Sequence, residues 1–263
     1  MKMSSRKIKF EKIWNARDMG GLLNAHGEMI SSGRLLRSAN LADATEMDKE
    51  MLQKQYHIAK IIDLRTEMER KEKPDVFIPN VEYQFIPIFD ESMAGISHEK
   101  SLNEEQILAA IPKLGFLYRQ IVTSDFCREN LGKAARCVMG HDFSKGSVLW
   151  HCTEGKDRCG LLTTVLLLTL GVEKGTIMED YLLTNEINEE KAEKYYEMML
   201  LAGKTEMEAV TIRDIFLAKE EYLNAAFGAI QEQYKNIDTF LCESLNISRK
   251  LIEKFQKSVL LER

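Results

Sequence analysis

The sequence has few prolines and no long uninterrupted run of apolar residues. It has 4 Pro among 263 residues and no low-complexity tract, so no stretch is typical of a linker between domains. It contains no run of about 18 apolar residues, the length of a membrane-spanning helix, and its charged first residues lack the apolar core of a secretory signal. We therefore expect one domain over residues 1–263 and no integral membrane segment.

Cysteine is scarce, and there is no excess of positive charge. The 5 Cys are odd in number and form no Cys-x2-Cys pair, which argues against a zinc ribbon or a disulfide framework and favours a reducing, cytoplasmic location. The net charge of −5 argues against a nucleic-acid partner, because nucleic acids attract basic proteins. The contents of hydrophobic residues (44%) and charged residues (29%) are those of an ordinary globular protein.

One polar loop lies between two apolar segments. Residues 148–150 have the composition of a buried strand, and residues 161–170 have that of a buried helix that ends before Gly171. A strand that leads into a helix through such a loop leaves backbone N–H groups unpaired around one concavity, with the positive end of the helix dipole behind them. The loop therefore predicts an anion site whose size suits phosphate.

Two side chains make this anion site a candidate reaction centre. Cys152 opens the loop, and its thiol should ionise easily when it faces amide dipoles, so that the thiolate is the nucleophile. Arg158 can hold two phosphoryl oxygens at once. We expect Gly155 to adopt a positive φ and Gly160 to let the helix approach the sheet closely. The pattern predicts attack of sulfur on phosphorus, a phosphocysteine intermediate and its hydrolysis by water, with no metal or organic cofactor.

The expected ligands of the phosphoryl group follow the cysteine in the loop. The predicted phosphate-binding residues are Thr153, Glu154, Gly155, Lys156, Asp157 and Arg158. A bare Cys-x5-Arg spacing is a weak signal, and a buried cysteine in an ordinary strand–helix turn is the alternative. A nucleotide-binding P-loop is excluded, because Lys156 is followed by Asp157 and not by Ser or Thr.

Residues 151–160, His-Cys-Thr-Glu-Gly-Lys-Asp-Arg-Cys-Gly, resemble the signature loop of the cysteine-based protein tyrosine phosphatases, and most resemble the bacterial branch with His-Cys-x-x-Gly-Lys-Asp-Arg. Residues 15–21, 33–38, 181–186, 221–227 and 230–245 are also similar to this branch. The resemblance implies a protein-tyrosine phosphatase, with dual-specificity or phosphoinositide activity as options. It implies a phosphorylated protein or phosphoinositide as substrate and inorganic phosphate as product. Because some members are exported, secretion without a recognisable signal stays an alternative.

The sequence departs from the family pattern directly after the arginine. The family usually has Thr or Ser there, whose hydroxyl hydrogen-bonds the thiolate, whereas this chain has Cys159. An S–H is a weaker donor, so a phospho-ligand binder with little turnover is the alternative function. A rhodanese-like sulfur transferase fits the loop less well. Cys159 is also a candidate partner for a protective disulfide with Cys152.

Cleavage of a phosphate ester needs a proton for the departing oxygen, and two aspartates are candidates for the general acid. Asp90 follows a predicted strand that ends in Pro-Ile-Phe, where the resembled branch has an aspartate. Asp157 lies inside the loop, where it could instead orient Arg158 or position water. His151 is expected to hydrogen-bond the loop backbone and so to fix the thiolate.

The expected fold is α/β, with a central, mainly parallel sheet flanked by helices and an additional C-terminal helical region. Strands are predicted at residues 35–36, 59–65, 81–88 and 148–150. Helices are predicted at 45–56, from 66 to before Pro74, and at 103–122, 125–139, 161–170, 176–201, 204–234 and 248–259. The first two begin with the spacing of a capping box, from Thr45 to Asp48 and from Thr66 to Glu69. Residues 174–236 are a candidate lid over the active site. The apolar residues 198–201 suit the underside of such a lid, although core packing is the default interpretation.

Several charged residues next to predicted strands have two interpretations. Arg17, Asp18 and Arg37 should form ion pairs that tie the N-terminal segment to the core, and binding of substrate phosphate by Arg37 is the alternative. Asp63 and Arg65 should form a salt bridge at a strand end, where open α/β sheets also bind ligands. The isolated His98 and His141 are expected to be surface or satisfied side chains.

Overall fold

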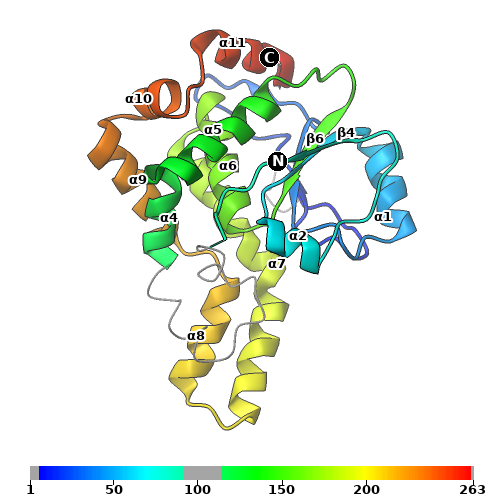
Figure 1. Cartoon of the computed structure of the whole chain (residues 1–263), viewed down its shortest axis with the longest axis vertical. Coiled ribbons are helices and arrows are strands. Elements are labelled where there is room, and N and C mark those ends of the chain that lie inside the picture. The colour runs from blue at the N-terminus through cyan, green and yellow to red at the C-terminus, as the bar shows by residue number, and fades with distance from the viewer. Residues whose placement is uncertain (1–5, 92–113, 262–263) are drawn as a thin grey trace.

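A five-stranded sheet lies at the centre of the computed structural model, which describes residues 6–91 and 114–261 (Figure 1). The strands, in spatial order, are β1 (Arg17–Asp18), β3 (Leu35–Ser38), β6 (Ser147–His151), β4 (Ile58–Asp63) and β5 (Glu82–Phe85). Strand β1 is antiparallel to β3, and the other three pairs are parallel. The prediction of a mainly parallel α/β sheet is confirmed.

The two faces of the sheet are covered by different segments. Side chains alternate along β6, so that Val148 and Trp150 enter the larger core and Leu149 the smaller one. The larger core is closed by α4 (Leu114–Thr123), α5 (Asp125–Met139), α6 (Asp157–Thr169), α9 (Glu220–Tyr234) and α11 (Arg249–Val259). The smaller core is closed by the N-terminal segment and by the π-helical η2 (Met51–Gln55), which directly follows α1 (Glu46–Glu50).

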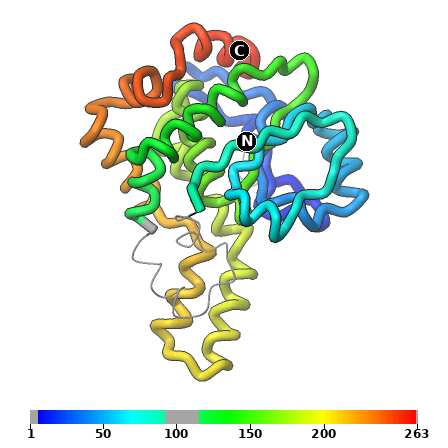
Figure 2. The backbone as a smooth tube through the Cα atoms, in the orientation of Figure 1, coloured from blue at the N-terminus to red at the C-terminus, as the bar shows by residue number. Residues whose placement is uncertain are grey.

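The two ends of the described chain pair with each other. Strand β2 (Met29–Ile30) is antiparallel to β7 (Leu260–Leu261), and Figure 2 shows the blue and red segments side by side. The short helix α2 (Glu67–Glu72) begins shortly after β4 ends, next to the carboxyl end of β6. Both predicted capping boxes form, at Thr45 and at Thr66.

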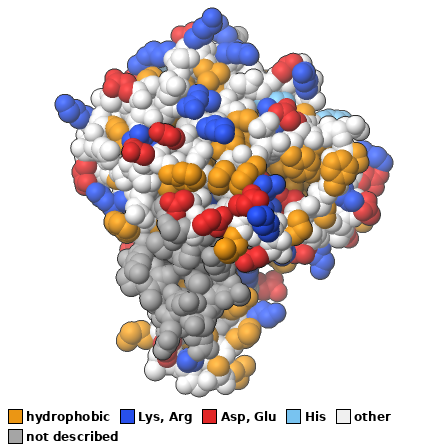
Figure 3. Space-filling model, viewed as in Figure 1, with side chains coloured by type: hydrophobic (Ala, Val, Ile, Leu, Met, Phe, Trp, Pro, Cys, Tyr) orange, Lys and Arg blue, Asp and Glu red, His pale blue; other side chains and the backbone are white. Residues whose placement is uncertain are grey.

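Two helices extend from the body as an antiparallel hairpin, which we call the α7–α8 hairpin (Figure 1). They are α7 (Lys174–Leu201) and α8 (Glu206–Phe216), and they share a small core of Met199, Ala209, Ile212 and Ile215. The default interpretation of core packing for residues 198–201 is wrong for three of the four, because Met198, Leu200 and Leu201 are exposed. Figure 3 shows apolar side chains at this lower end of the molecule.

Some predicted helix boundaries are wrong. Helix α6 begins at Asp157, four residues earlier than predicted, and an acidic residue in the first turn suits the helix dipole. The helical region predicted at 204–234 is two helices. At the break between them, the side chain of Asn185 donates a hydrogen bond to the Ala218 carbonyl and accepts one from the Ala218 N–H. Two short elements follow, α10 (Ile237–Thr239) and the π-helical η4 (Phe240–Ser244).

The predicted helix at 103–122 is described only from Leu114, and His98 lies outside the described residues. His141 is satisfied as expected, since its Nε2 lies 3.2 Å from the carbonyl oxygen of Gly146. Among residues 6–91 and 114–261, no helix combines the length and the apolar character that crossing a bilayer requires.

Candidate active site

The signature loop, residues 152–158, joins the central strand β6 to the N-terminus of α6. Gly155 adopts φ of 68°, as predicted. A Cβ at this position would lie 2.7 Å from the backbone of Ser38 and Ala39, so only glycine fits the tight contact between the loop and β3. Gly160 has a different role from the predicted one, because a Cβ there would lie 3.1 Å from the ring of Tyr181 rather than against the sheet.

Three carbonyl groups of the loop accept hydrogen bonds from side chains outside it. Asn40 donates to the Thr153 carbonyl from Nδ2 at 3.0 Å, Asn15 Nδ2 donates to that of Glu154 at 3.0 Å, and an Arg37 nitrogen donates to that of Gly155 at 2.6 Å. Within the described part of the chain, no acceptor takes the backbone N–H groups of residues 153–156. The loop therefore presents its amides inward, as an anion site does.

A buried ion cluster fixes this carbonyl side of the loop. Asp180, on α7, pairs with Arg6 at 2.7 Å, Arg17 at 3.3 Å and Arg37 at 3.5 Å. Burial favours the neutral carboxyl, but the charges of the arginines outweigh it and hold the pKa of Asp180 far below its usual range. The predicted ion pairs of Arg17 and Arg37 are confirmed, and Arg37 contacts loop carbonyls rather than the amide side. Asp18 accepts two backbone N–H groups instead of pairing with an arginine.

Arg158 is fully buried and is oriented by a carboxylate that the sequence analysis identified only as a helix cap. Its guanidinium donates to both oxygens of Glu69, at 2.7 and 2.8 Å, and its Cζ lies 4.9 Å from the centre of the Phe89 ring. Thr153 Oγ1 also donates to Glu69, at 2.9 Å. Burial raises the pKa of Glu69, but the Arg158 charge and the hydrogen bonds outweigh it and lower the pKa. A bidentate pair of this kind fixes the plane of the guanidinium.

Cys152 and Cys159 are both fully buried neighbours, and the Cys159 N–H donates to the Cys152 sulfur. The Cys159 thiol also donates to the carbonyl oxygens of Ser38, at 3.7 Å, and Trp150, at 3.9 Å. Burial raises the pKa of Cys152 well above its usual range, and the Cys159 sulfur raises it further. Burial also opposes ionisation of Cys159, but the Cys152 thiol and the charges of Arg37 and Arg158 lower its pKa. The easy ionisation expected of Cys152 is therefore not found in this structure, because burial and the neighbouring sulfur raise its pKa.

His151 connects the loop to a buried network at the carboxyl ends of β4 and β6. Its Nε2 lies 3.1 Å from Asp75 Oδ2, and its Nδ1 lies 3.5 Å from the Cys152 carbonyl oxygen, so the expected backbone contact is present at its outer limit. Burial lowers the pKa of His151, but the charges of Asp63 and Asp75 outweigh it and raise the pKa. Asp75 was not identified from the sequence.

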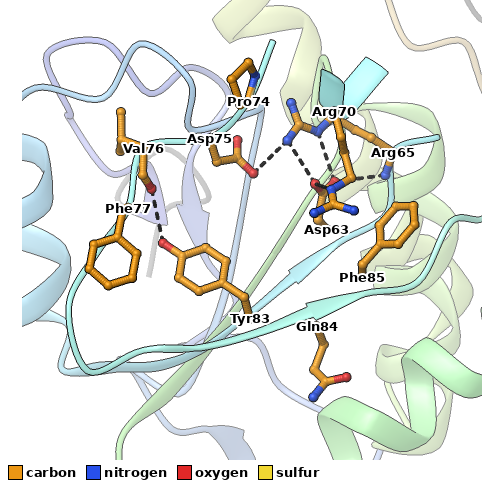
Figure 4. Close-up of a pocket in the computed structure, with 10 residues that line it drawn as sticks. All are labelled: Asp63, Arg65, Arg70, Pro74, Asp75, Val76, Phe77, Tyr83, Gln84 and Phe85. Carbon is orange, nitrogen blue, oxygen red and sulfur yellow. Dashed lines mark hydrogen bonds and ion pairs between the residues drawn. The ribbon is translucent and has the colours of Figure 1, made fainter. Parts of the chain in front are cut away.

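The same network lines a pocket of about 290 Å³ (Figure 4). Arg65 lies between the two aspartates, with NH2 2.9 Å from Asp63 and 2.7 Å from Asp75, so the predicted salt bridge is confirmed. Ligand atoms of Asp63, Asp75 and His151 lie within 4.8 Å of one another. These residues do not fit a metal ion, because the Arg65 guanidinium already supplies the positive charge and both carboxylates accept hydrogen bonds from it.

The two candidate acids lie in different surroundings. Asp157 is buried in the first turn of α6, where its Oδ1 accepts the Tyr118 hydroxyl at 2.6 Å and its charge raises the pKa of Cys152. Asp90 is partly exposed beyond β5, and its charge acts on Cys127 of α5.

The α7–α8 hairpin contacts the loop from outside. Lys156 Nζ is buried and donates to the Ile215 carbonyl at 2.6 Å, at the end of α8. Lys191 of α7 pairs with Glu154 at 2.7 Å. Beside Thr153 and Glu154 lies a further pocket, of about 390 Å³, whose walls include the exposed Trp14. The hairpin is therefore attached to the loop that it flanks.

A thiol pair and an arginine around inward-facing amides are the arrangement of a cysteine-dependent enzyme that handles phosphate esters. A model of the tyrosine phosphatase family matches residues 8–261, and the chain belongs to this family. The family match confirms the resemblance and the predicted enzyme class, a protein-tyrosine phosphatase, and it favours an active phosphatase over a binder without turnover.

Named relatives agree with the family match. A protein of Cupriavidus necator named as a tyrosine-protein phosphatase is 28% identical over 243 residues, which are 91% of this chain and 84% of the relative. The triple specificity protein phosphatase PtpB of Mycobacterium tuberculosis is 25% identical over 276 residues, covering 92% and 95%. A chain of the P. aeruginosa TpbA crystal structure aligns with 82% of this chain and 89% of its own length, at 13% identity and a TM-score of 0.37, a similarity too low to carry an argument.

Proposed function

We propose that the chain hydrolyses phosphate monoesters at the signature loop, with Cys152 as the nucleophile. The observation that carries this proposal is the orientation of the loop backbone, with its carbonyls anchored outward and the N–H groups of residues 153–156 directed inward. Such a ring of amides favours a dianionic phosphoryl group, and Arg158 adds a fixed positive charge held by Glu69.

The first step transfers the phosphoryl group to sulfur. Attack requires a thiolate at Cys152, and the hydrogen bond from the Cys159 N–H stabilises that charge. The S–P bond forms as the P–O bond to the leaving group breaks, and a general acid gives the leaving oxygen its proton. The Cys159 S–H then donates to the Cys152 sulfur, the role that a Ser or Thr hydroxyl has in the family.

The second step releases inorganic phosphate. Water attacks phosphorus, the S–P bond breaks, and the aspartate that acted as acid accepts a proton from the water. Lys156 and the charge of Arg158 stabilise the additional negative charge that develops on the phosphoryl oxygens. Asp157 and Asp90 both remain candidates for the acid in this proposal.

The substrates proposed are phosphorylated proteins, first of all those with phosphotyrosine. The name of the Mycobacterium tuberculosis relative, a triple specificity phosphatase, supports tests of phosphoserine, phosphothreonine and phosphoinositide substrates as well. Lys156 supports the same tests, since a second cation in the loop suits a more highly charged ligand. The five cysteines, which all lie among the described residues, form no disulfide, which supports action in a reducing compartment such as the cytoplasm.

Hydrolysis of p-nitrophenyl phosphate tests the proposal. Wild-type protein should hydrolyse it, with activity that persists in EDTA and is blocked by vanadate. Cys152→Ser should reduce kcat by roughly 10⁴-fold or more, because the nucleophile is lost. Cys242→Ser, a change of a partly buried cysteine on η4, is the matched control and should keep wild-type activity. Equal activity of the two serine variants would refute the role of Cys152.

A further inference from the structure

Three tyrosines from three helices meet beside Asp157. Tyr118 comes from α4, Tyr181 from α7 and Tyr222 from α9, and all three are buried. The ring centroids of Tyr118 and Tyr181 are 6.0 Å apart in an edge-to-face arrangement, and those of Tyr118 and Tyr222 are 5.8 Å apart. Helices distant in sequence thus fix one aromatic wall around the loop carboxylate.

The hydroxyls of this wall form a hydrogen-bond chain that ends at Asp157. The Tyr118 hydroxyl donates to Asp157 Oδ1 at 2.6 Å, and the Tyr118 and Tyr181 oxygens are 2.7 Å apart. The backbone N–H of Lys219, at the start of α9, donates to the Tyr181 oxygen. Burial raises the pKa of both tyrosines well above the usual value, so both hydroxyls keep their protons at working pH.

The direction of this chain is determined by its two ends. An ionised Asp157 can only accept, so Tyr118 donates to it and accepts from Tyr181. The reverse direction would leave the Tyr181 hydroxyl proton without an acceptor among the described residues, which is costly for a buried group. Lys156 Nζ also lies 3.5 Å from Oδ1. Oδ1 therefore faces donors only, and a proton on Asp157 resides on Oδ2.

We propose that Tyr118, supported by Tyr181, is a positioning residue that reserves Oδ1 of Asp157 as an acceptor and leaves Oδ2 as the oxygen that protonates the leaving group. This inference rests on the proposed function. During the first step the Oδ2 proton moves to the leaving oxygen as the P–O bond breaks, and Tyr118 and Lys156 stabilise the new carboxylate at Oδ1. Water returns a proton to Asp157 in the second step.

The groups that face Asp157 are known on each side. They are Lys156 and Cys152 from the signature loop, Tyr118 from α4, Tyr181 from α7 and Tyr222 from α9. Of these, only the Tyr118 hydroxyl donates to Asp157 at hydrogen-bond distance among the described residues. Its loss should leave the Asp157 carboxylate without that donor at Oδ1, so that the oxygen which carries the proton is no longer determined.

Tyr118→Phe tests the proposal, because it keeps the ring and removes the hydroxyl. Phenyl phosphate, with a poor leaving group, depends on protonation, whereas p-nitrophenyl phosphate depends on it much less. We expect kcat for phenyl phosphate to fall about 10- to 100-fold and kcat for p-nitrophenyl phosphate to fall less than about threefold. Tyr181→Phe should change the ratio of the two rates in the same direction by a smaller amount.

Tyr234→Phe is the matched control. The Tyr234 hydroxyl donates to the Val122 carbonyl at 3.0 Å and so joins α9 to α4. The variant removes a similar contact between helices and should leave the ratio of kcat for the two substrates unchanged. An unchanged ratio in both Tyr118→Phe and Tyr181→Phe would overturn the proposal, as would a loss confined to phenyl phosphate in Asp90→Asn alone. A wild-type protein inactive on every phosphate ester would instead refute the proposed function.

Discussion

At the scale of single residues, the central finding is that the reactive side chains are held by partners from other elements. Arg158 forms a bidentate ion pair with Glu69 of α2, and the Cys152 sulfur accepts a hydrogen bond from the backbone N–H of Cys159 of α6. These partners set the charge and the orientation of each group before a substrate arrives. Pre-organisation of this kind removes the need to reorient dipoles during the reaction.

Glu69→Gln should separate the two roles of this side chain. Glutamine also completes a capping box, so the helix start is kept while the charge that orients Arg158 is lost. We expect kcat/KM for p-nitrophenyl phosphate to fall roughly 10- to 100-fold, as for a misplaced catalytic group. Glu208→Gln is the control. Glu208 holds the equivalent position in the capping box at Thr205, and among the described residues its carboxylate forms no ion pair with an arginine. Equal kinetics in the two variants would show that Glu69 acts only as a cap.

Cys159 should protect Cys152 from irreversible oxidation. Hydrogen peroxide oxidises the Cys152 thiolate to a sulfenic acid, and attack by the Cys159 sulfur then expels water and forms a disulfide. Because the two thiols are already in hydrogen-bond contact, activity lost to peroxide should return with dithiothreitol in the wild type and not in Cys159→Ser. Peptide mass spectrometry should find the Cys152–Cys159 crosslink, and its absence would remove this prediction.

At the scale of elements, the signature loop depends on its close contact with the β3 end. Gly155→Ala should destabilise the protein by more than Gly203→Ala. Both glycines have positive φ, but a Cβ at 203 would meet nothing within 4 Å, whereas at 155 it would lie 2.7 Å from the β3 backbone. We expect about 1 kcal/mol for Gly203→Ala and clearly more for Gly155→Ala, measured by urea unfolding. Equal losses would show that φ alone makes glycine necessary at 155.

Much of the element pattern could be predicted from the sequence, because local signals determine it. Apolar runs gave the positions of β4 and β6, and both predicted capping boxes formed. The boundary between α8 and α9 could not be predicted, because it depends on a contact from Asn185, more than 30 residues away. The same reason hides Asp75 and the second role of Glu69, which are defined by partners across the fold.

At the scale of the whole molecule, buried charges link stability to pH in two directions. Glu69 has a lowered pKa in the folded state, so its contribution is present above its ordinary value of 4.5 and is lost as pH falls through the folded pKa. His151 has a raised pKa, so its contribution is present below its ordinary value of 6.5 and is lost as pH rises through the folded pKa. Considered alone, these two groups place the maximal free energy of unfolding between about pH 4.5 and pH 6.5.

The free energy of unfolding, measured with urea across pH, should therefore decline from about pH 6.5 upward. The matched variant is His141→Gln. His141 is also buried, but burial lowers its pKa, so this histidine does not contribute to the decline. His151→Gln should abolish much of the decline, and His141→Gln should keep it. A wild-type stability that rises steadily from pH 6.5 to 8 would contradict the assignment of a protonated His151 between two carboxylates.

The most direct test of the account is to find the phosphoryl group on the protein. Wild-type protein mixed with excess p-nitrophenyl phosphate, quenched in acid within milliseconds and digested, should yield a peptide that carries phosphate on Cys152 by mass spectrometry. A burst of p-nitrophenol that matches the amount of this peptide would support it further. Turnover with no modified Cys152 at any quench time, or with phosphate on another residue, would contradict the claim that the signature loop holds the phosphoryl group for attack by this sulfur.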